Sequence, residues 1–240
     1  MPTVFPKGQL ALYVLIFALA YTGLIAAIDY LQLNSSSSFS VVEIFLEATL
    51  CLYACIAIGG LKAVTKKHPQ TTTSALMRYV LLIGGPSALS FVILALAITL
   101  LGMSDALQIQ ATYLVLGVVS GLIFFILATL FGLSLPGALR EPKDTIGEAF
   151  QRGKRQASFT LPRLLFFMAP FSVAAFALSV AAAATGLFGN APAGTMIFSP
   201  NELLVTFVVK LLGGMAIVAF AAIIMAAFQK DEEERLAEAG

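Results

Sequence analysis

The chain has 240 residues, of which 59% are hydrophobic and only 11% are Asp, Glu, Lys or Arg. An average soluble domain carries roughly 25% charged residues, so this composition excludes an ordinary soluble enzyme and indicates a membrane protein. The net charge of +1 lacks the basic surplus that nucleic-acid binding requires, and we expect no nucleic-acid partner. Both cysteines lie in one apolar segment, which excludes a disulfide framework.

Six apolar runs follow one another along the chain, each near the ~20 residues that a helix needs to cross a hydrocarbon core. They cover residues 10–28, 41–61, 79–101, 111–135, 164–184 and 203–228. The first run is longer than the roughly 7–15 apolar residues of a signal peptide, so we expect a retained span. The sequence therefore predicts an all-α polytopic membrane protein, with one six-span domain over residues 1–240 that ends in an acidic cytoplasmic tail at 229–240.

The basic residues are distributed with a strong sidedness. Of the 14 Lys and Arg residues, all except Lys210 fall in alternate connections between the runs. They are Lys7, Lys62, Lys66, Lys67, Arg78, Arg140, Lys143, Arg152, Lys154, Arg155, Arg163, Lys230 and Arg235. Short loops that carry Lys and Arg stay on the cytoplasmic side. This distribution predicts six spans with both termini in the cytoplasm.

The connection between the fourth and fifth runs predicts a short amphipathic helix. Thr145 and Glu148 have the spacing of a capping box, in which each side chain satisfies a free backbone donor at a helix start. Apolar residues then recur at helical spacing, with polar residues on the other side. The apolar set is Ile146, Ala149, Phe150 and Ala157, and the polar set is Gln151, Arg152, Lys154 and Arg155.

We expect this helix, over residues 145–157, to lie along the inner membrane surface with Phe150 in lipid and Arg152 in water. Cations there each contribute roughly 1 kcal/mol against anionic lipid. One hypothesis is that Arg152, Lys154 and Arg155 contact lipid headgroups. The alternatives are that these cations only set the topology or that they meet a protein partner.

The run GEAFQRGKRQASFTLPRLLFF, placed between a fourth and a fifth span, carries a resemblance. It resembles the inner connection of a loose family of uncharacterised bacterial six-helix membrane proteins, related to the membrane domain of some glycerophosphodiester phosphodiesterases. The resemblance implies six helices in a bacterial inner membrane. It implies no catalytic residues, and the chain has no phosphodiesterase domain.

Charged residues also occur inside two of the apolar runs. Glu43 and Glu47 lie four residues apart on one helix face, and Glu202 and Lys210 share a face of the last run. Counted from the run ends at ~1.5 Å per residue, Glu47 and Lys210 lie at a similar depth. Because lone charges in lipid are costly, we expect Glu47 and Lys210 to pair, with snorkelling of Lys210 as the alternative. Glu43 and Glu202 are expected near the outer end, where water reaches them.

Residues with the spacing of catalytic or metal sites are missing. There is no zinc-protease, nucleophile-elbow, phosphate-loop or dinucleotide-binding motif. The single histidine, His68, stands among polar loop residues, and a metal site needs several convergent ligands. The sequence therefore predicts no metal or cofactor site and no enzymatic activity.

Two functional hypotheses follow. The first is a non-enzymatic membrane protein that packs with, anchors or helps assemble another membrane component. Its support is small-residue spacing such as Gly117 and Gly121, which allows close helix contacts in lipid. The second is a small-solute transporter or channel that uses the Glu47–Lys210 site, with Pro86 and Pro170 bending two spans. Membrane lipids, and other membrane subunits under the first hypothesis, are the expected partners.

Overall fold

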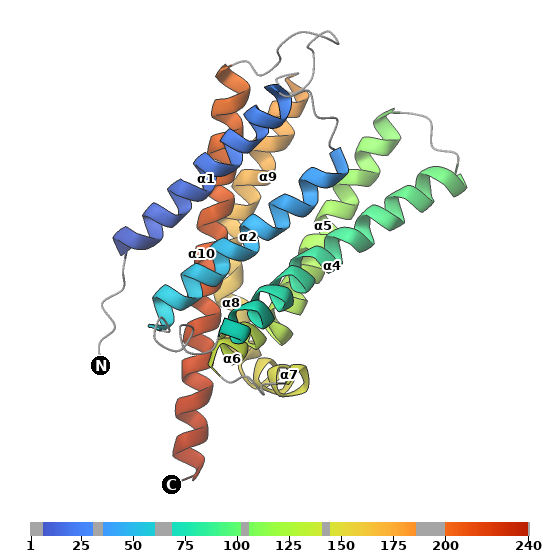
Figure 1. Cartoon of the computed structure of the whole chain (residues 1–240). Helices are drawn as coiled ribbons and strands as arrows, with labels where there is room; N and C mark the ends of the chain where they lie inside the picture. The colour runs from blue at the N-terminus through green and yellow to red at the C-terminus, as the bar shows by residue number, and fades with distance from the viewer. Residues whose placement is uncertain are drawn as a thin grey trace. The chain divides into compact units, whose positions relative to one another are not determined.

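The computed structural model describes residues 7–30, 36–60, 69–101, 106–140, 145–185 and 200–239, and no strand occurs in these ranges (Figure 1). The all-helical class predicted from composition and spacing is therefore confirmed for this part of the chain. The chain divides into two compact units, each with its own packing. The first is Met1–Lys67 with Pro162–Ala226, and the second is His68–Leu161 with Ala227–Gly240.

Five helical segments within the described ranges are long and apolar enough to cross a membrane. They are Gly8–Ala27, Val42–Gly59, Val118–Arg140, Ala157–Ala182 and Pro200–Glu238. In lipid a helix satisfies its own backbone groups, which is why apolar runs of this length are helical. The third predicted run, residues 79–101, lies inside a long helix, Pro69–Leu101, that is not among these five. The count of six spans stays a prediction.

The first unit contains helices that pack closely around a glycine. Its elements are α1 (Lys7–Tyr30), α2 (Ser36–Gly59), η1 (Leu164–Met168), α9 (Ala169–Ala184) and the part of α10 (Pro200–Ala239) up to Ala226. A Cβ added at Gly214 of α10 would lie 3.0 Å from Val14 and 3.2 Å from Phe17 of α1, and 3.5 Å from Leu50 of α2. The absence of a side chain at Gly214 therefore lets three helices approach one another. Cys51 and Cys55 are buried on α2 and are not joined by a disulfide.

The chain that enters α9 is distorted. A short helix, α8 (Ala157–Arg163), contains Pro162, and the π-helical turn η1 follows directly. Proline has no N–H to donate and crowds the preceding turn, and π-turns are a common way for a helix to absorb such a defect. The predicted fifth span, 164–184, is thus helical throughout but begins in a widened turn.

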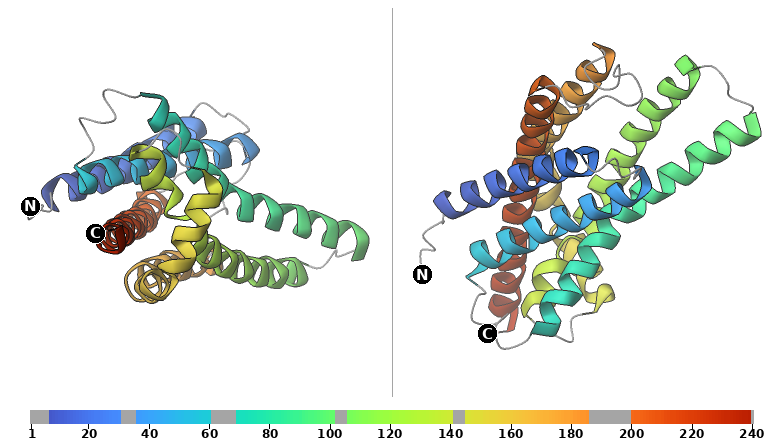
Figure 2. Two further views of the ribbon diagram at one scale, coloured as in Figure 1. Left: turned by 90° about the horizontal axis from the view of Figure 1, so that it is seen from below. Right: turned by 45° about the horizontal axis from the view of Figure 1, so that its top comes forward.

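The second unit is built on a helical hairpin. It contains α4 (Pro69–Leu101), α5 (Ala106–Phe131), α6 (Ser134–Arg140), α7 (Ile146–Arg155), the start of α8 and the end of α10. Helices α4 and α5 lie side by side, and Figure 2 shows the same pairing from two further directions. Helix α6 packs on α4, and α7 packs on both α5 and α6.

Helix α10 is much longer than the predicted sixth span. It has 40 residues, which at ~1.5 Å each gives about 60 Å, twice the ~30 Å hydrocarbon core. The predicted tail therefore continues the helix as far as Ala239. Residues 233–238 are exposed as a solvated tail should be, but Asp231 is buried. Within the acidic tail predicted at 229–240, Asp231 is therefore packed against other residues and not exposed to solvent.

Candidate functional site

The start of α7 forms as the sequence predicts. Thr145 is the N-cap, its side chain accepts from the Glu148 amide at 3.2 Å, and Glu148 accepts from the Thr145 amide at 2.8 Å. The predicted capping box is confirmed. These bonds lower the pKa of Glu148, and the bond from the Thr145 backbone has the largest effect. The carboxylate therefore stays ionised near neutral pH and keeps the first turn of the helix closed.

Close contact with α5 fixes the path of α7. The rings of Phe150 and Phe131 lie 5.4 Å apart, and Ala149 is buried. A Cβ added at Gly153 would lie 2.6 Å from the carbonyl carbon of Leu130. Real Cβ atoms essentially never come that close to backbone, so α7 approaches α5 at a distance that only glycine allows.

Two arginines of α7 surround a buried aspartate of α10. Arg155 donates from Nε and Nη2 to the two Asp231 oxygens at 2.9 and 3.0 Å, and Asp231 is only 1% exposed. The Nε of Arg152 lies 3.9 Å from the same carboxylate. A two-bond fork of this kind is the strongest arginine–carboxylate geometry. The hydrogen bond to Asp231 raises the pKa of Arg155.

The prediction that Arg152 faces water was wrong, because this side chain is 6% exposed. Its guanidinium lies 5.2 Å from the centre of the Phe228 ring, with Asp231 beside it. A carboxylate and an aromatic face together allow a cation to be buried. Of the three predicted headgroup cations, Lys154 is exposed and Arg155 is half exposed.

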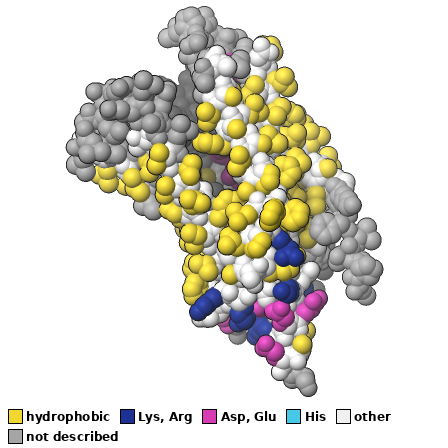
Figure 3. Space-filling model, turned by 180° about the vertical axis from the view of Figure 1, so that it is seen from behind, with side chains coloured by type: hydrophobic (Ala, Val, Ile, Leu, Met, Phe, Trp, Pro, Cys, Tyr) yellow, Lys and Arg dark blue, Asp and Glu magenta, His cyan; other side chains and the backbone are white. Residues whose placement is uncertain are grey.

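Further contacts fasten α10 to the same region. Arg140 of α6 pairs with Glu232 and lies 5.6 Å from the centre of the Phe228 ring. The amide of Gln156 donates to Glu234 at 2.5 Å. We call Arg140, Arg152, Arg155, Asp231 and Glu232 the arginine platform. Figure 3 shows charged side chains gathered around this end of α10.

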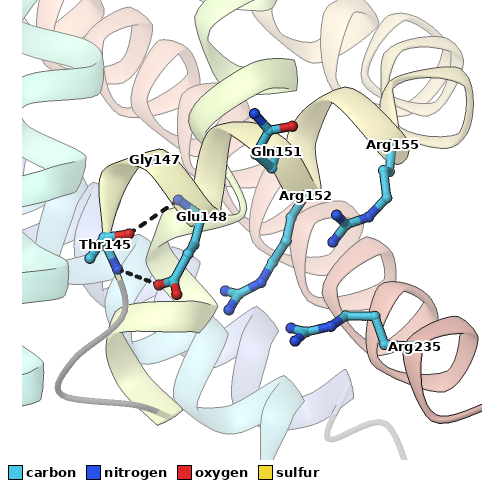
Figure 4. Close-up of a pocket in the computed structure, with 7 residues that line it drawn as sticks. All are labelled: Thr145, Gly147, Glu148, Gln151, Arg152, Arg155 and Arg235. Carbon is cyan, nitrogen blue, oxygen red and sulfur yellow. Dashed lines mark hydrogen bonds between the residues drawn. The ribbon is translucent and has the colours of Figure 1, made fainter. Parts of the chain in front are cut away.

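An open pocket of about 450 Å³ lies beside the arginine platform. Its lining consists of Thr145, Gly147, Glu148, Gln151, Arg152, Arg155 and Arg235. Figure 4 shows the side chains of Arg152 and Arg155 from α7 and of Arg235 from α10 directed into the same space. The sequence did not single out Arg235, because it stands in the acidic tail and only the folded chain brings it to α7.

The charges expected inside the membrane form a second group, on α1, α2 and α10 of the first unit. Lys210 pairs with Glu43, and its amine lies 4.0 Å from the centre of the Tyr21 ring. Glu47 is half-buried and close enough to Glu43 and Lys210 to interact electrostatically. We call Tyr21, Glu43, Glu47 and Lys210 the lysine cluster.

The ion pair of Lys210 is therefore with Glu43, one helical turn from the expected Glu47. Side chains of a helix lean toward its N-terminus, and both α2 and α10 begin at the same end of the first unit (Figure 1). The lysine stem is longer than that of glutamate, so its amine reaches further toward this end and pairs with Glu43. Glu202 lies in the first turn of α10 and is half-buried.

Neither group has the composition of a metal site. No three His, Cys, Asp or Glu side chains in the described ranges gather closely enough to hold a metal ion. His68, with Lys62, Lys66, Lys67 and Lys143, lies outside the described residues. No protein-family model, curated protein or solved structure matches this chain. Function is therefore inferred from the arginine platform and the lysine cluster themselves.

Proposed function

We propose that the chain is a non-enzymatic integral membrane protein that anchors or helps assemble another membrane component. The observation that carries this proposal is the burial of Asp231 between Arg155 and Arg152. The charged residues of this region are used to fasten helices together, whereas a catalytic site would leave acids, bases or nucleophiles directed at a substrate. A rigid charged surface at the end of a long helix is suited to holding a partner.

We further propose six spans with both termini in the cytoplasm of a bacterial inner membrane. The cations of the arginine platform, together with Lys230 and Arg235, gather at one end of the second unit, in keeping with the rule that Lys and Arg stay on the cytoplasmic side. The resemblance of residues 147–167 to six-helix membrane proteins also supports this topology. Reporter fusions at the two termini test it, and an outward signal from either end contradicts it.

Photocrosslinking in intact membranes tests the anchoring role. A photoreactive residue at Lys154, which is exposed on α7, should give one discrete protein adduct whose partner peptide is identified by mass spectrometry. The same residue at Val173 of α9, which is 64% exposed, is the control for general membrane contact. The adduct should disappear in Asp231→Asn. Adducts with lipid alone at both positions contradict the proposal.

A second candidate, a small-solute carrier, has support from the lysine cluster. One cation there faces two acidic side chains, Glu43 and Glu47, so the acidic groups outnumber the basic one. Acidic groups inside membrane helices frequently mark ion or proton paths. Proton flux through proteoliposomes that depends on Glu47 and stops in Glu47→Gln would favour this candidate. Flux equal to that of empty liposomes would remove it.

A further inference from the structure

The pocket beside the arginine platform brings together cations from two distant parts of the chain. Arg152 and Arg155 come from the C-terminal half of α7, and Arg235 comes from the end of α10. One carboxylate, that of Glu148, also lines the pocket. Figure 4 shows that Glu148 turns back to Thr145, where the capping bonds occupy it. The lining is therefore positively charged.

The arginines are held in place before any ligand arrives. Asp231 is buried beneath Arg155 and takes two of its five N–H donors, which leaves three for another acceptor. Phe228 supports the guanidinium of Arg152. Preorganised side chains lose less entropy when they bind, so a ligand gains more from each contact.

Arg235 differs from the two arginines of α7. It is exposed and makes no ion pair with any residue in the described part of the chain. Its donors are available to a ligand, and its charge helps to lower the pKa of Glu148. Three guanidinium groups, one of them without an ion pair in the described part of the chain, therefore line one pocket and can together receive an anion.

We propose that this pocket binds the phosphate group of a phosphate ester. A phosphate presents several acceptor oxygens around one tetrahedral centre, which suits guanidinium forks that approach from different elements. A pocket of about 450 Å³ falls in the range of roughly 300–1,000 Å³ that holds small organic ligands, so it has room for the organic part of the ester. The ester is either a lipid headgroup or a soluble compound.

The experiment uses the full chain in maltoside micelles, which contain no phosphate. Two phosphomonoesters, ethyl phosphate and dihexanoyl phosphatidic acid, are titrated by calorimetry at constant ionic strength, with succinate as the carboxylate control. We expect Arg235→Gln to weaken binding roughly tenfold, as the loss of one charge-assisted contact predicts. Lys154→Gln removes the same charge from an exposed position on α7 outside the pocket, and should leave the affinity unchanged.

Binding of both esters supports a site for the phosphate itself, and binding of only the phosphatidic acid supports a lipid headgroup. Equal losses in Arg235→Gln and Lys154→Gln would show general charge attraction and overturn the proposal. Succinate binding as tight as the esters, or no binding of either ester, would also overturn it. The proposal does not depend on the anchoring role, because photocrosslinking at Lys154 and binding of an ester can succeed or fail independently.

Discussion

The arginine platform and the lysine cluster both set cations against carboxylates, but the balance of charge is opposite. In the platform Arg140, Arg152 and Arg155 face Asp231 and Glu232, and Arg235 lies beside them without an ion pair among the described residues. In the cluster Lys210 alone faces Glu43 and Glu47. Excess cation favours an anionic ligand, whereas excess carboxylate in an apolar helix favours a cation or a proton. The sign of the surplus therefore indicates what each region is able to bind.

The two regions also differ in how many contacts hold each charge. Asp231 receives a two-bond fork from Arg155 and lies near Arg152, and Phe228 covers two guanidinium groups. Lys210 has one ion pair and one ring contact. Removing the central carboxylate of the platform should thus cost more than breaking the pair in the cluster.

The largest effect is expected for Asp231→Asn. This change leaves Arg152 buried beside a neutral amide, and breaking a buried pair costs about 3 kcal/mol. The free energy of unfolding in micelles, followed by helical circular dichroism against denaturant, measures it. Glu233→Gln removes an exposed carboxylate two residues further along α10 and is the matched control. Equal effects of the two changes would mean that Asp231 is solvated like its neighbours.

Gly153→Ala should have the next largest effect, about 2 kcal/mol, because the new methyl group overlaps the backbone of Leu130 and forces α7 away from α5. The measurement is again the free energy of unfolding. Gly147→Ala on the same helix is the control, since its added Cβ meets only a Thr145 oxygen at 3.9 Å. A neutral Gly153→Ala would contradict the close approach of the two helices.

A double-mutant cycle measures which carboxylate of the lysine cluster pairs with Lys210. Lys210→Met and Glu43→Gln should each destabilise the protein, and the pair together should cost less than their sum by about 1 kcal/mol, because each single change leaves the partner unpaired. The same cycle with Glu47→Gln should show a smaller coupling energy. A larger coupling with Glu47 than with Glu43 would restore the partner predicted from the sequence.

The smallest effect is expected for Thr145→Ala, which removes one side of the capping box and should cost about 1 kcal/mol. The loss of the hydroxyl also removes one of the bonds that lower the pKa of Glu148. The contribution of this carboxylate to stability is present above its unfolded pKa and disappears as pH falls through the lower folded value. Thr145→Ser keeps the hydroxyl, so it should retain both the stability of the cap and the lowered pKa of Glu148. If Thr145→Ser is as damaging as Thr145→Ala, the cap does not act through its hydroxyl.

Local patterns predicted local structure well. The capping box was recognised from Thr145 and Glu148 because both partners lie within one turn of the same helix. The apolar runs identified helices for the same reason, although α4 begins at Pro69, ten residues before the predicted 79, since its first turns are polar.

Contacts between distant segments could not be predicted. Asp231 stands in an acidic run that resembles a solvated tail, and its partner Arg155 lies 76 positions away. Arg235 reaches the pocket only because α10 continues past the predicted span. The need for glycine at position 153 depends on which face of α7 meets α5. For Lys210 the helix face was correct, but the partner depended on the lean and length of the side chain.

Hydrogen exchange of the full chain, followed by mass spectrometry, tests whether the arginine platform holds the end of α10 against α6 and α7. The backbone amides of residues 229–233 should exchange slowly, and this protection should disappear in Asp231→Asn while α1 and α2 remain protected. Protection requires a folded helix held by contacts that resist local opening. Exchange of residues 229–233 as fast as that of an unstructured peptide would show that the arginines do not hold this end of α10.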